Sequence, residues 1–233
     1  MSRRTQRQQY LGRPCTVEEV ARLIAPTDAE LDLNIAIESD RRKREAVAAL
    51  VRRFAVRDFS CYSAWRETFR YIHFNENKSA DDGFFLRSLM GPMSQARQRL
   101  MRWVLDPAVM QCLRLFGTPC RMASQLADLV AGSPHLLVAA LPCARSQEQE
   151  LFQAGSRLLE VWLRAEELGL AIHPISVMLQ HEDARQALQA SLSTPGRVIF
   201  FARLGRGSGG CGTNPRRSAD SIVDFTRSAW AAG

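Results

Sequence analysis

The seven-residue run His135–Leu141, which reads His-Leu-Leu-Val-Ala-Ala-Leu, constrains the fold of this chain more than any other segment. It is almost entirely apolar and is closed by Pro142, a pattern typical of a central β-strand that is buried on both faces. We predict a long helix over Glu148–Leu168 and expect it to lie deep in the protein, because apolar residues cover most of its circumference. A buried strand with helices to cover it favours an α+β domain.

Two further strands and a capped helix are predicted around that central strand. Apolar and polar residues alternate over Leu31–Ser39, as in a half-buried strand, and Val198–Leu204 is mostly apolar. Thr16 followed by Glu19 has the spacing of a capping box, and the helix that it starts should end before Pro26.

The stretch between the outer strands is mostly helical in pattern. The predicted helices are Arg41–Arg57, Tyr62–His73, Ser94–Leu105, Pro107–Phe116 and Arg121–Ala131. Residues 58–134 separate one strand-helix unit from the next strong strand, so we interpret them as a helical insertion or lid within a single domain of residues 1–233. A helical layer that only completes the core would give the same pattern, and both interpretations remain open at this point.

Positive charge comes almost entirely from arginine. Of the 31 basic residues only Lys43 and Lys78 are lysines, and with 24 acidic residues the formal net charge is +7. Arginines concentrate near the two ends of the chain: Arg3, Arg4, Arg7 and Arg13, then Arg197, Arg203, Arg206, Arg216 and Arg217. If the two ends converge, their guanidinium groups would form one anion site, whereas two solvated surfaces would need no ligand.

Nothing in the sequence indicates a membrane or secretion. No apolar stretch approaches the roughly 18 residues that a spanning helix needs, and the Arg-rich start lacks the apolar region of a signal peptide. The six cysteines are widely separated and include no Cys-x-x-Cys pair, so they match neither a zinc site nor a disulfide framework. We therefore expect a cytoplasmic protein with reduced thiols, no metal and no membrane contact.

Three separated segments follow the order of one known pattern. They are Arg3–Arg7 (Arg-Arg-Thr-Gln-Arg), Glu160–Ser176 with its Leu-Gly-Leu stretch, and Pro215–Ser218 (Pro-Arg-Arg-Ser). Together they resemble the FMN-dependent nitroreductase family. The resemblance implies a nitroreductase-like α+β fold with a central mixed, mainly antiparallel sheet flanked by helices.

The first and third segments correspond to the phosphate site of that family. There, a basic residue, a hydroxyl residue and a second basic residue near the start hold the FMN phosphate, and a basic pair near the end completes the site. Guanidinium and hydroxyl groups together can satisfy several phosphate oxygens. The resemblance implies this role for Arg3, Arg4, Thr5, Arg7, Arg216 and Arg217.

The second segment resembles the buried helix and the turn that pass the isoalloxazine ring. It implies that Pro174, Ile175 and Ser176 contact the flavin through backbone groups, with one amide pointing at N5. His173, which precedes this turn, is expected to cap the exit of the helix. No catalytic side chain is required, because the flavin carries the chemistry at N5.

The aromatic segments Trp65–Phe74 and Asp81–Phe84 resemble the lidded branch of the family. That branch includes the Acg-type proteins and relatives fused to adenylyltransferase-like domains, and some of its members are suspected of storing FMN. Tyr71, His73 and Phe74 are then candidate residues of the substrate pocket. An aromatic helix face is, however, more often plain core.

The resemblance implies an FMN oxidoreductase that takes electrons from NADH, NADPH or another donor and passes them to a small organic substrate of unspecified identity. A chain with one copy of the fold implies a homodimer with the flavin at the interface and Asp220–Ala232 as an arm around the partner. Two alternatives remain: a lidded protein that sequesters FMN without catalysis, and an Arg-rich module that binds nucleic acid or another polyanion. The second is the weaker, since the sequence holds no RNA-binding or helix-turn-helix motif.

Overall fold

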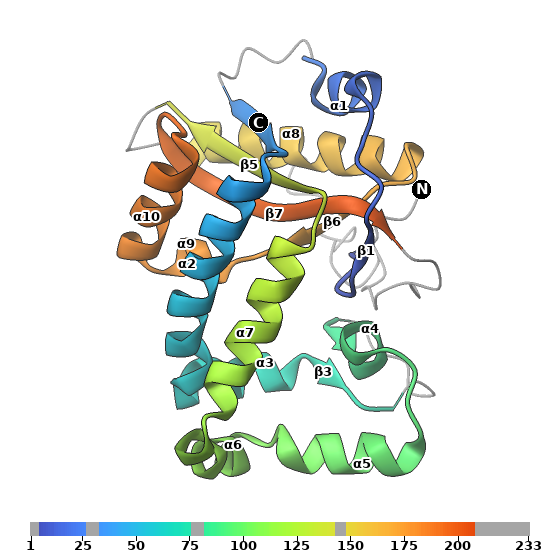
Figure 1. Cartoon of the computed structure of the whole chain (residues 1–233), viewed down its shortest axis with the longest axis vertical. Coiled ribbons are helices and arrows are strands. Elements are labelled where there is room, and N and C mark those ends of the chain that lie inside the picture. Colours follow the sequence, from blue (N-terminus) through green and yellow to red (C-terminus); the bar gives the residue numbers. More distant parts are fainter. Residues whose placement is uncertain (1–4, 27–32, 76–81, 143–147, 208–233) are drawn as a thin grey trace, which may run out of the picture.

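A five-stranded antiparallel sheet forms the centre of the protein (Figure 1). The computed structural model describes residues 5–26, 33–75, 82–142 and 148–207. The strands run in the order β1-β7-β5-β2, and β6 pairs with β7. Their bounds are β1 (Tyr10–Leu11), β2 (Asn34–Glu38), β5 (His135–Leu141), β6 (Ala171–Pro174) and β7 (Arg197–Gly207).

The three predicted strands are present, and the pairing is simpler than expected. All seven residues of β5 are buried, as its apolar sequence requires, and β7 extends past the predicted Val198–Leu204 at both ends. Every pair between described strands of this sheet is antiparallel, where a mixed, mainly antiparallel sheet was expected. The parallel pair of β3 (Ile72–His73) and β4 (Phe84–Phe85) lies in a separate two-stranded sheet.

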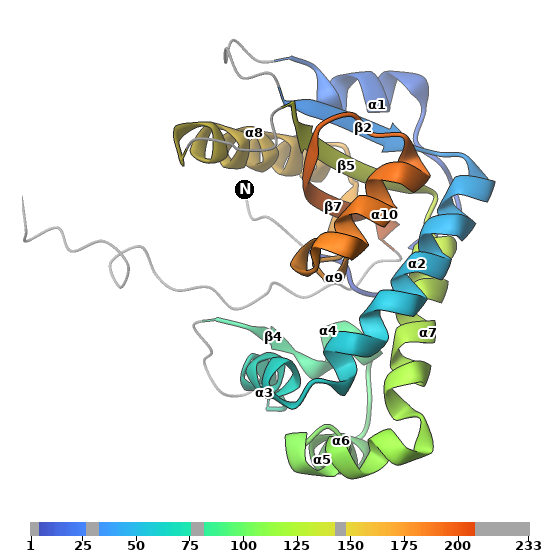
Figure 2. The same ribbon diagram turned by 90° about the vertical axis from the view of Figure 1, so that its left-hand side faces the viewer.

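Helices cover both faces of the sheet, which explains why β5 is apolar throughout (Figure 2). Leu136, Val138 and Ala140 of β5 belong to a core cluster with the helices of one face, and Leu137 belongs to a second cluster with those of the other. The first face carries α2 (Arg41–Ser60), α7 (Thr118–Ala131), α9 (Val177–Gln180) and α10 (Glu182–Leu192), and the second carries α1 (Val17–Ile24) and α8 (Glu148–Glu167).

Two of these helices test the sequence analysis directly. The capping box at the start of α1 is confirmed, because the Thr16 side chain accepts from the Glu19 backbone and the Glu19 carboxylate accepts from the Thr16 backbone. The expectation that α8 lies deep in the protein is wrong, because only one face of this helix is buried in the single chain. Its buried face includes Val161 and Trp162, while Phe152 on the other face is 76% exposed.

A helical lobe, defined here as the described residues between 62 and 116, lies at the far end of α2 and α7 (Figures 1 and 2). It has a hydrophobic cluster of its own, made by Trp65, Ile72, Leu86, Leu105 and Met110. Its elements are α3 (Tyr62–Arg70), β3, β4, α4 (Leu86–Met90), α5 (Gln95–Val104), α6 (Pro107–Leu113) and the 3-10 helix η1 (Arg114–Phe116).

Several predicted helix ends shift in the structure. The helix predicted to run to His73 ends at Arg70, because the chain turns at Tyr71 into β3. The helix predicted over Pro107–Phe116 is divided into α6 and η1. No helix in the described residues is long and apolar enough to cross a membrane.

Candidate functional site

A fully buried arginine lies at the centre of the candidate site. Arg203 is in the middle of β7, directly opposite His173 of β6, and its exposed fraction is 0%. Its Nε donates to Ser133 Oγ at 2.8 Å and its Nη2 donates to the Gln8 carbonyl at 2.8 Å. Its Nη1 lies 3.0 Å from His173 Nδ1 and 3.4 Å from the Arg7 carbonyl oxygen. Arg203 thus connects β6 to the segment before β1.

His173 is held neutral by this contact. A guanidinium group can only donate hydrogen bonds, so Nδ1 of His173 must accept and the ring proton must be on Nε2. Burial, with the nearby charges of Arg203 and Arg7, holds the pKa of His173 well below its ordinary value. The expectation that His173 caps the exit of the preceding helix is wrong, because the residue lies inside β6 and bonds to β7.

The N-terminal segment, residues 5–9, is positioned mainly by side-chain contacts. Gln6 is 2% exposed, and its carbonyl accepts from the Tyr10 hydroxyl at 3.3 Å. The guanidinium carbon of Arg7 lies 4.4 Å from the centre of the Phe84 ring, and Gln8 Nε2 donates to the Arg87 carbonyl at 3.3 Å. The segment therefore lies against both the sheet and the helical lobe.

A cavity of about 390 Å³ is lined by the turn that sequence reasoning singled out, Pro174, Ile175 and Ser176, together with His173. Its other walls come from the end of α2, from α3 and from α7, and include Phe59 and Trp65. The Ile175 backbone is fixed by its bond to the Phe201 carbonyl at 2.9 Å. Ser176 is exposed, and its backbone N–H has no acceptor among the described residues.

The charges around this cavity are negative or neutral. Among the described residues that line it, none is lysine or arginine, and Asp58 and Glu67 are acidic. Both carboxylates are engaged: Asp58 Oδ1 lies 2.8 Å from His181 Nε2, and Glu67 accepts from Arg70 at 3.3 Å. The cavity therefore suits an uncharged, mainly apolar group.

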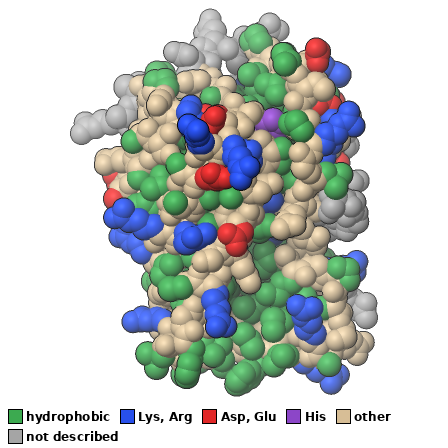
Figure 3. Space-filling view, viewed as in Figure 1, with side chains coloured by type: hydrophobic (Ala, Val, Ile, Leu, Met, Phe, Trp, Pro, Cys, Tyr) green, Lys and Arg blue, Asp and Glu red, His purple; other side chains and the backbone are tan. Residues whose placement is uncertain are grey.

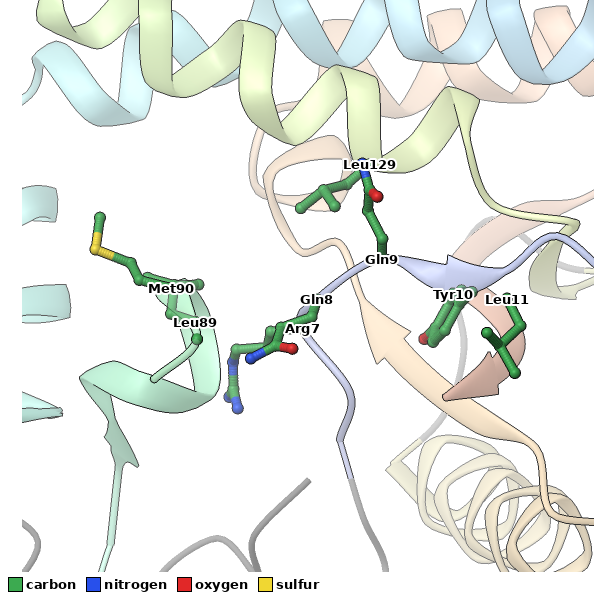
Figure 4. A pocket seen from close by; sticks show the side chains of 9 residues that line it. Arg7, Gln8, Gln9, Tyr10, Leu11, Leu89, Met90 and Leu129 are labelled. Carbon is green, nitrogen blue, oxygen red and sulfur yellow. The ribbon is translucent and has the colours of Figure 1, made fainter. Parts of the chain in front are cut away.

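An open cleft of about 540 Å³ lies between the N-terminal segment, α4 and α7 (Figure 4). Arg7 and Gln8 line it from the segment, and Leu89 and Met90 line it from α4. In Figure 4, Gln9 extends toward Leu129 of α7. Arg7 is the only basic side chain among the described residues that line this cleft.

The structure brings some predicted site residues together and separates others. The main chain of Arg7 and the strand that leads into Pro174–Ser176 both contact the Arg203 guanidinium. Thr5 is half-buried in the same N-terminal segment. Arg3, Arg4, Arg216, Arg217 and the expected arm Asp220–Ala232 lie outside the described residues.

The three candidate pocket residues line neither cavity. His73 Nε2 lies 2.6 Å from the Asp82 carbonyl oxygen, and the Phe74 ring packs against Phe69 at 5.6 Å. Tyr71 is 42% exposed at the end of α3. The aromatic side chains that do line the 390 Å³ cavity, Phe59 and Trp65, come from earlier in the chain.

Sequence reasoning grouped Arg203 with the arginines near the end of the chain and missed its role. Arg203 is the single charged residue within the apolar run Phe200–Leu204, and a lone charge inside a buried strand signals an internal partner. Arg206, from the same group, also bonds inward, to the Leu168 carbonyl at 3.2 Å and to Glu19. These two arginines are therefore not part of a solvated basic surface.

Comparison with known proteins adds independent findings, although no family model matches the chain. A protein of Serratia sp. (strain ATCC 39006) named probable NAD(P)H nitroreductase PigM is 34% identical over 229 residues. The match covers 98% of this chain and 63% of that protein, so the chain spans less than two thirds of that relative's length.

Solved structures with similar folds are more distant in sequence. The FMN and NADPH-dependent nitroreductase NfnB of Sphigopyxis sp. strain HMH has a TM-score of 0.56 at 17% identity, covering 96% of this chain and 95% of that one. Iodotyrosine deiodinase bound to FMN and 3-iodo-L-tyrosine has a TM-score of 0.56 at 15% identity, covering 96% and 95%. The FMN-dependent nitroreductase NfnB of Mycobacterium smegmatis, in complex with NADPH, has 0.54 at 14%, covering 95% and 92%. These likenesses confirm a nitroreductase-like α+β fold.

Proposed function

We propose that this chain, whose fold is nitroreductase-like, is an FMN-dependent oxidoreductase that moves electrons between NADH or NADPH and a small organic substrate. The observation that carries the proposal is the shared contact of Arg203 with both the N-terminal segment and the strand before the Pro174–Ser176 turn. The relative named NAD(P)H nitroreductase and the structures bound to FMN support the same cofactor and donor.

The residues around the turn fit the ring of a flavin. A cavity of about 390 Å³ is within the range of cofactor pockets, and no described residue of its lining is a lysine or arginine that would favour an anion there. The Ser176 N–H, which lacks an acceptor among the described residues, is available to donate to a ring atom. Phe59 and Trp65 supply aromatic surface on the side of the helical lobe.

The phosphate end is supported by fewer described groups. Thr5 and Arg7 lie in the N-terminal segment, and Arg7 borders the open cleft instead of the apolar cavity. This separation of a basic edge from a cavity whose described lining has no basic side chain matches a ligand with one anionic end and one planar end. We further propose that Arg3, Arg4, Arg216 and Arg217 complete the phosphate site.

The chain would contribute orientation and a dry environment to the reaction. Bound FMN supplies the redox chemistry, since its N5 can accept a hydride and return the electron pair to a second molecule. The Ser176 N–H would fix the position of the ring edge. His173, held neutral, adds no positive charge to the cavity, and Ile175, Val177 and Trp65 exclude water from it.

Substrate choice would depend on the helical lobe. Trp65 and Thr68 of α3 face the turn across the cavity, so the lobe covers the place where the ring is proposed to lie. This arrangement supports our assignment to the lidded branch of the family. It also favours one alternative, an FMN-sequestering protein whose lid leaves no room for substrate. A cytoplasmic location and the roles of Tyr71, His73 and Phe74 stay predictions.

We also propose that two copies of this chain form a homodimer. Leu151, Phe152 and Leu159 are 46%, 76% and 47% exposed along one face of α8. Further apolar side chains gather on the surface of the helical lobe (Figure 3), among them Trp103, 61% exposed, and Phe116, 76% exposed. Apolar surface of this extent is typical of an interface.

The homodimer is tested by Phe152→Asp, which should shift the protein from dimer to monomer in analytical ultracentrifugation. Val17→Asp is the matched control, because Val17 is 81% exposed and belongs to α1 instead of α8. A monomeric wild type, or equal dimer dissociation for both variants, would contradict the proposed interface.

The flavin function is tested by the visible spectrum of the purified protein, followed by anaerobic addition of NADPH and NADH. The absorption bands of oxidised flavin should be present and should bleach when a nicotinamide is added. Bands that persist would favour sequestration or another electron donor. A colourless protein that cannot be reconstituted with FMN would refute the flavin proposal.

A further inference from the structure

Arg203 is a buried cation whose partners among the described residues carry no negative charge. Within the described residues, its hydrogen-bond partners are the Ser133 hydroxyl, two backbone carbonyls and His173 Nδ1. The Tyr10 ring lies 4.5 Å from its guanidinium carbon. Burying an ion without a counter-charge is costly, so a chain that retains one gains something that an apolar residue would not provide.

Arg203 is one of the groups that position the N-terminal segment, and it binds the backbone of that segment directly. Strand pairing begins only at Tyr10, which is opposite Gly207, so residues 5–9 have no ladder of backbone bonds to the sheet. Arg203 supplies bonds from the body of the protein to two consecutive carbonyls of the segment, those of Arg7 and Gln8. The planar guanidinium group can hold both carbonyls in one fixed geometry.

The same side chain also fixes the other half of the proposed site. Because His173 is opposite Arg203 in the β6–β7 register, the guanidinium reaches the residue immediately before Pro174. His173 therefore lies in one bonded unit with the backbone of Arg7 and Gln8. Ser133, which follows the end of α7, accepts a hydrogen bond from Arg203 Nε. Its hydroxyl in turn donates to the Leu129 carbonyl at 2.6 Å.

We propose that Arg203 is a positioning residue that holds the N-terminal segment at a fixed distance from the His173–Ser176 turn. This inference rests on the proposed function, in which the segment binds the phosphate of FMN and the turn binds its ring. With the two parts held together, FMN binds to a preformed site and does not have to order the segment itself.

The test compares two buried arginines. Arg157 is 8% exposed and donates from Nη2 to the carbonyls of Ile24 and Ala25, on the opposite face of the sheet. Arg203→Met and Arg157→Met each remove a buried cation that binds backbone carbonyls. We expect FMN affinity, measured by quenching of flavin fluorescence on titration of the apoprotein, to fall at least about tenfold for Arg203→Met, as when one or two hydrogen bonds are lost. Arg157→Met should leave it within about twofold.

The variant Arg203→Lys distinguishes the effect of the guanidinium's hydrogen-bond geometry from the effect of its positive charge. A lysine keeps the charge but presents it as one compact ammonium that cannot reproduce the planar fork, so we expect it to bind FMN nearly as weakly as Arg203→Met. Wild-type affinity in Arg203→Lys would overturn the proposal. Equal losses in the Arg203 and Arg157 variants would also overturn it, because they would indicate a general effect of stability.

Hydrogen exchange without flavin gives a readout that does not depend on the proposed function. The amides of residues 5–9 should exchange faster in Arg203→Met than in Arg157→Met or wild type, while those of β5 stay protected. Unchanged exchange in this segment would refute the positioning role even if FMN binds. Faster exchange of this segment in Arg203→Met, together with a wild-type protein that fails to bind FMN, would support the positioning role and refute the flavin function instead. If Arg203→Met does not fold, Ser133→Ala, which removes one acceptor of the same guanidinium, should give a smaller effect of the same sign.

Discussion

One buried and one partly buried histidine should make the protein lose stability as the pH falls below neutrality. His135 is 3% exposed, its Nε2 accepts from the Cys15 backbone N–H at 2.7 Å, and its Nδ1 lies 2.7 Å from Ser39 Oγ. His173 accepts from Arg203. In each ring one nitrogen accepts a hydrogen bond. A second proton on the ring would turn that nitrogen into an N–H donor that points at the N–H group it now accepts from.

Stability falls with falling pH because the folded protein lowers the pKa of both histidines. Desolvation by burial, with the charge of Arg44 nearby, lowers the pKa of His135, and burial with Arg203 and Arg7 lowers that of His173. The unfolded chain therefore binds more protons than the folded one below the ordinary histidine pKa of about 6.5. Each histidine adds a slope of about 1.36 kcal/mol per pH unit, so the pair adds about 2.7 kcal/mol per unit until the folded-state pKa values are reached. Against a typical free energy of unfolding of about 5–15 kcal/mol, this loss is easily measured.

The assay is urea unfolding of the apoprotein at pH 7.5, 6.5 and 5.5. For the pair, the free energy of unfolding should fall by only about 0.7 kcal/mol between pH 7.5 and 6.5, and by about 2 kcal/mol between pH 6.5 and 5.5. His135→Gln and His173→Gln keep a neutral group that can both donate and accept, and each should reduce the slope by about half. Equal slopes in the wild type and the double variant would refute the reasoning.

Three further changes probe local structure by urea unfolding. Gly83→Ala should destabilise the protein by about 1–3 kcal/mol, because φ is +74° and a Cβ atom would clash with the Tyr71 carbonyl oxygen. Its control is Gly12→Ala, which should be nearly neutral because no atom lies within 4 Å of the added Cβ. Trp65→Phe removes the bond from Nε1 to the Leu105 carbonyl at 2.8 Å and should cost about 1–3 kcal/mol for a buried acceptor left unpaired; an unchanged midpoint would contradict this. Thr16→Ala removes the capping box of α1 and should cost about 0.5–2 kcal/mol, whereas Thr16→Ser should retain most of it.

Local signals in the sequence were sufficient where one short pattern decides the outcome. The run His135–Leu141 specified β5 to the residue, because only burial on both faces accommodates so many apolar side chains in succession. The Thr16 and Glu19 pair specified the start of α1 in the same way. The α10 helix was missed, although Ala184, Leu188 and Leu192 recur at helical spacing and are all buried. That spacing is the signal that could have found it.

Patterns that depend on distant partners were harder to interpret. Because apolar residues cover most of the circumference of α8, we expected this helix to be buried in its own chain. The pattern shows only that the helix surface is apolar, and it does not show whether the same chain or a second copy covers that surface. The short strand β6 has no pattern of its own, and its register is set by β7. Arg203 looked like one more basic residue near the end of the chain, because its acceptors come from residues 7, 8, 133 and 173. A single sequence gives no indication that these positions meet.

The separate cluster of the helical lobe has a consequence for how such a protein changes over evolutionary time. Because Trp65, Ile72, Leu86, Leu105 and Met110 pack mainly on one another, replacements among them need not be compensated in the clusters on either side of the sheet. A lobe of different sequence, grafted between the last turn of α2 and the first turn of α7, would have to match those two junctions and the contacts that Phe84 and Arg87 make with the N-terminal segment. Such an exchange would replace the α3 side of the 390 Å³ cavity and leave the side formed by the His173–Ser176 turn unchanged.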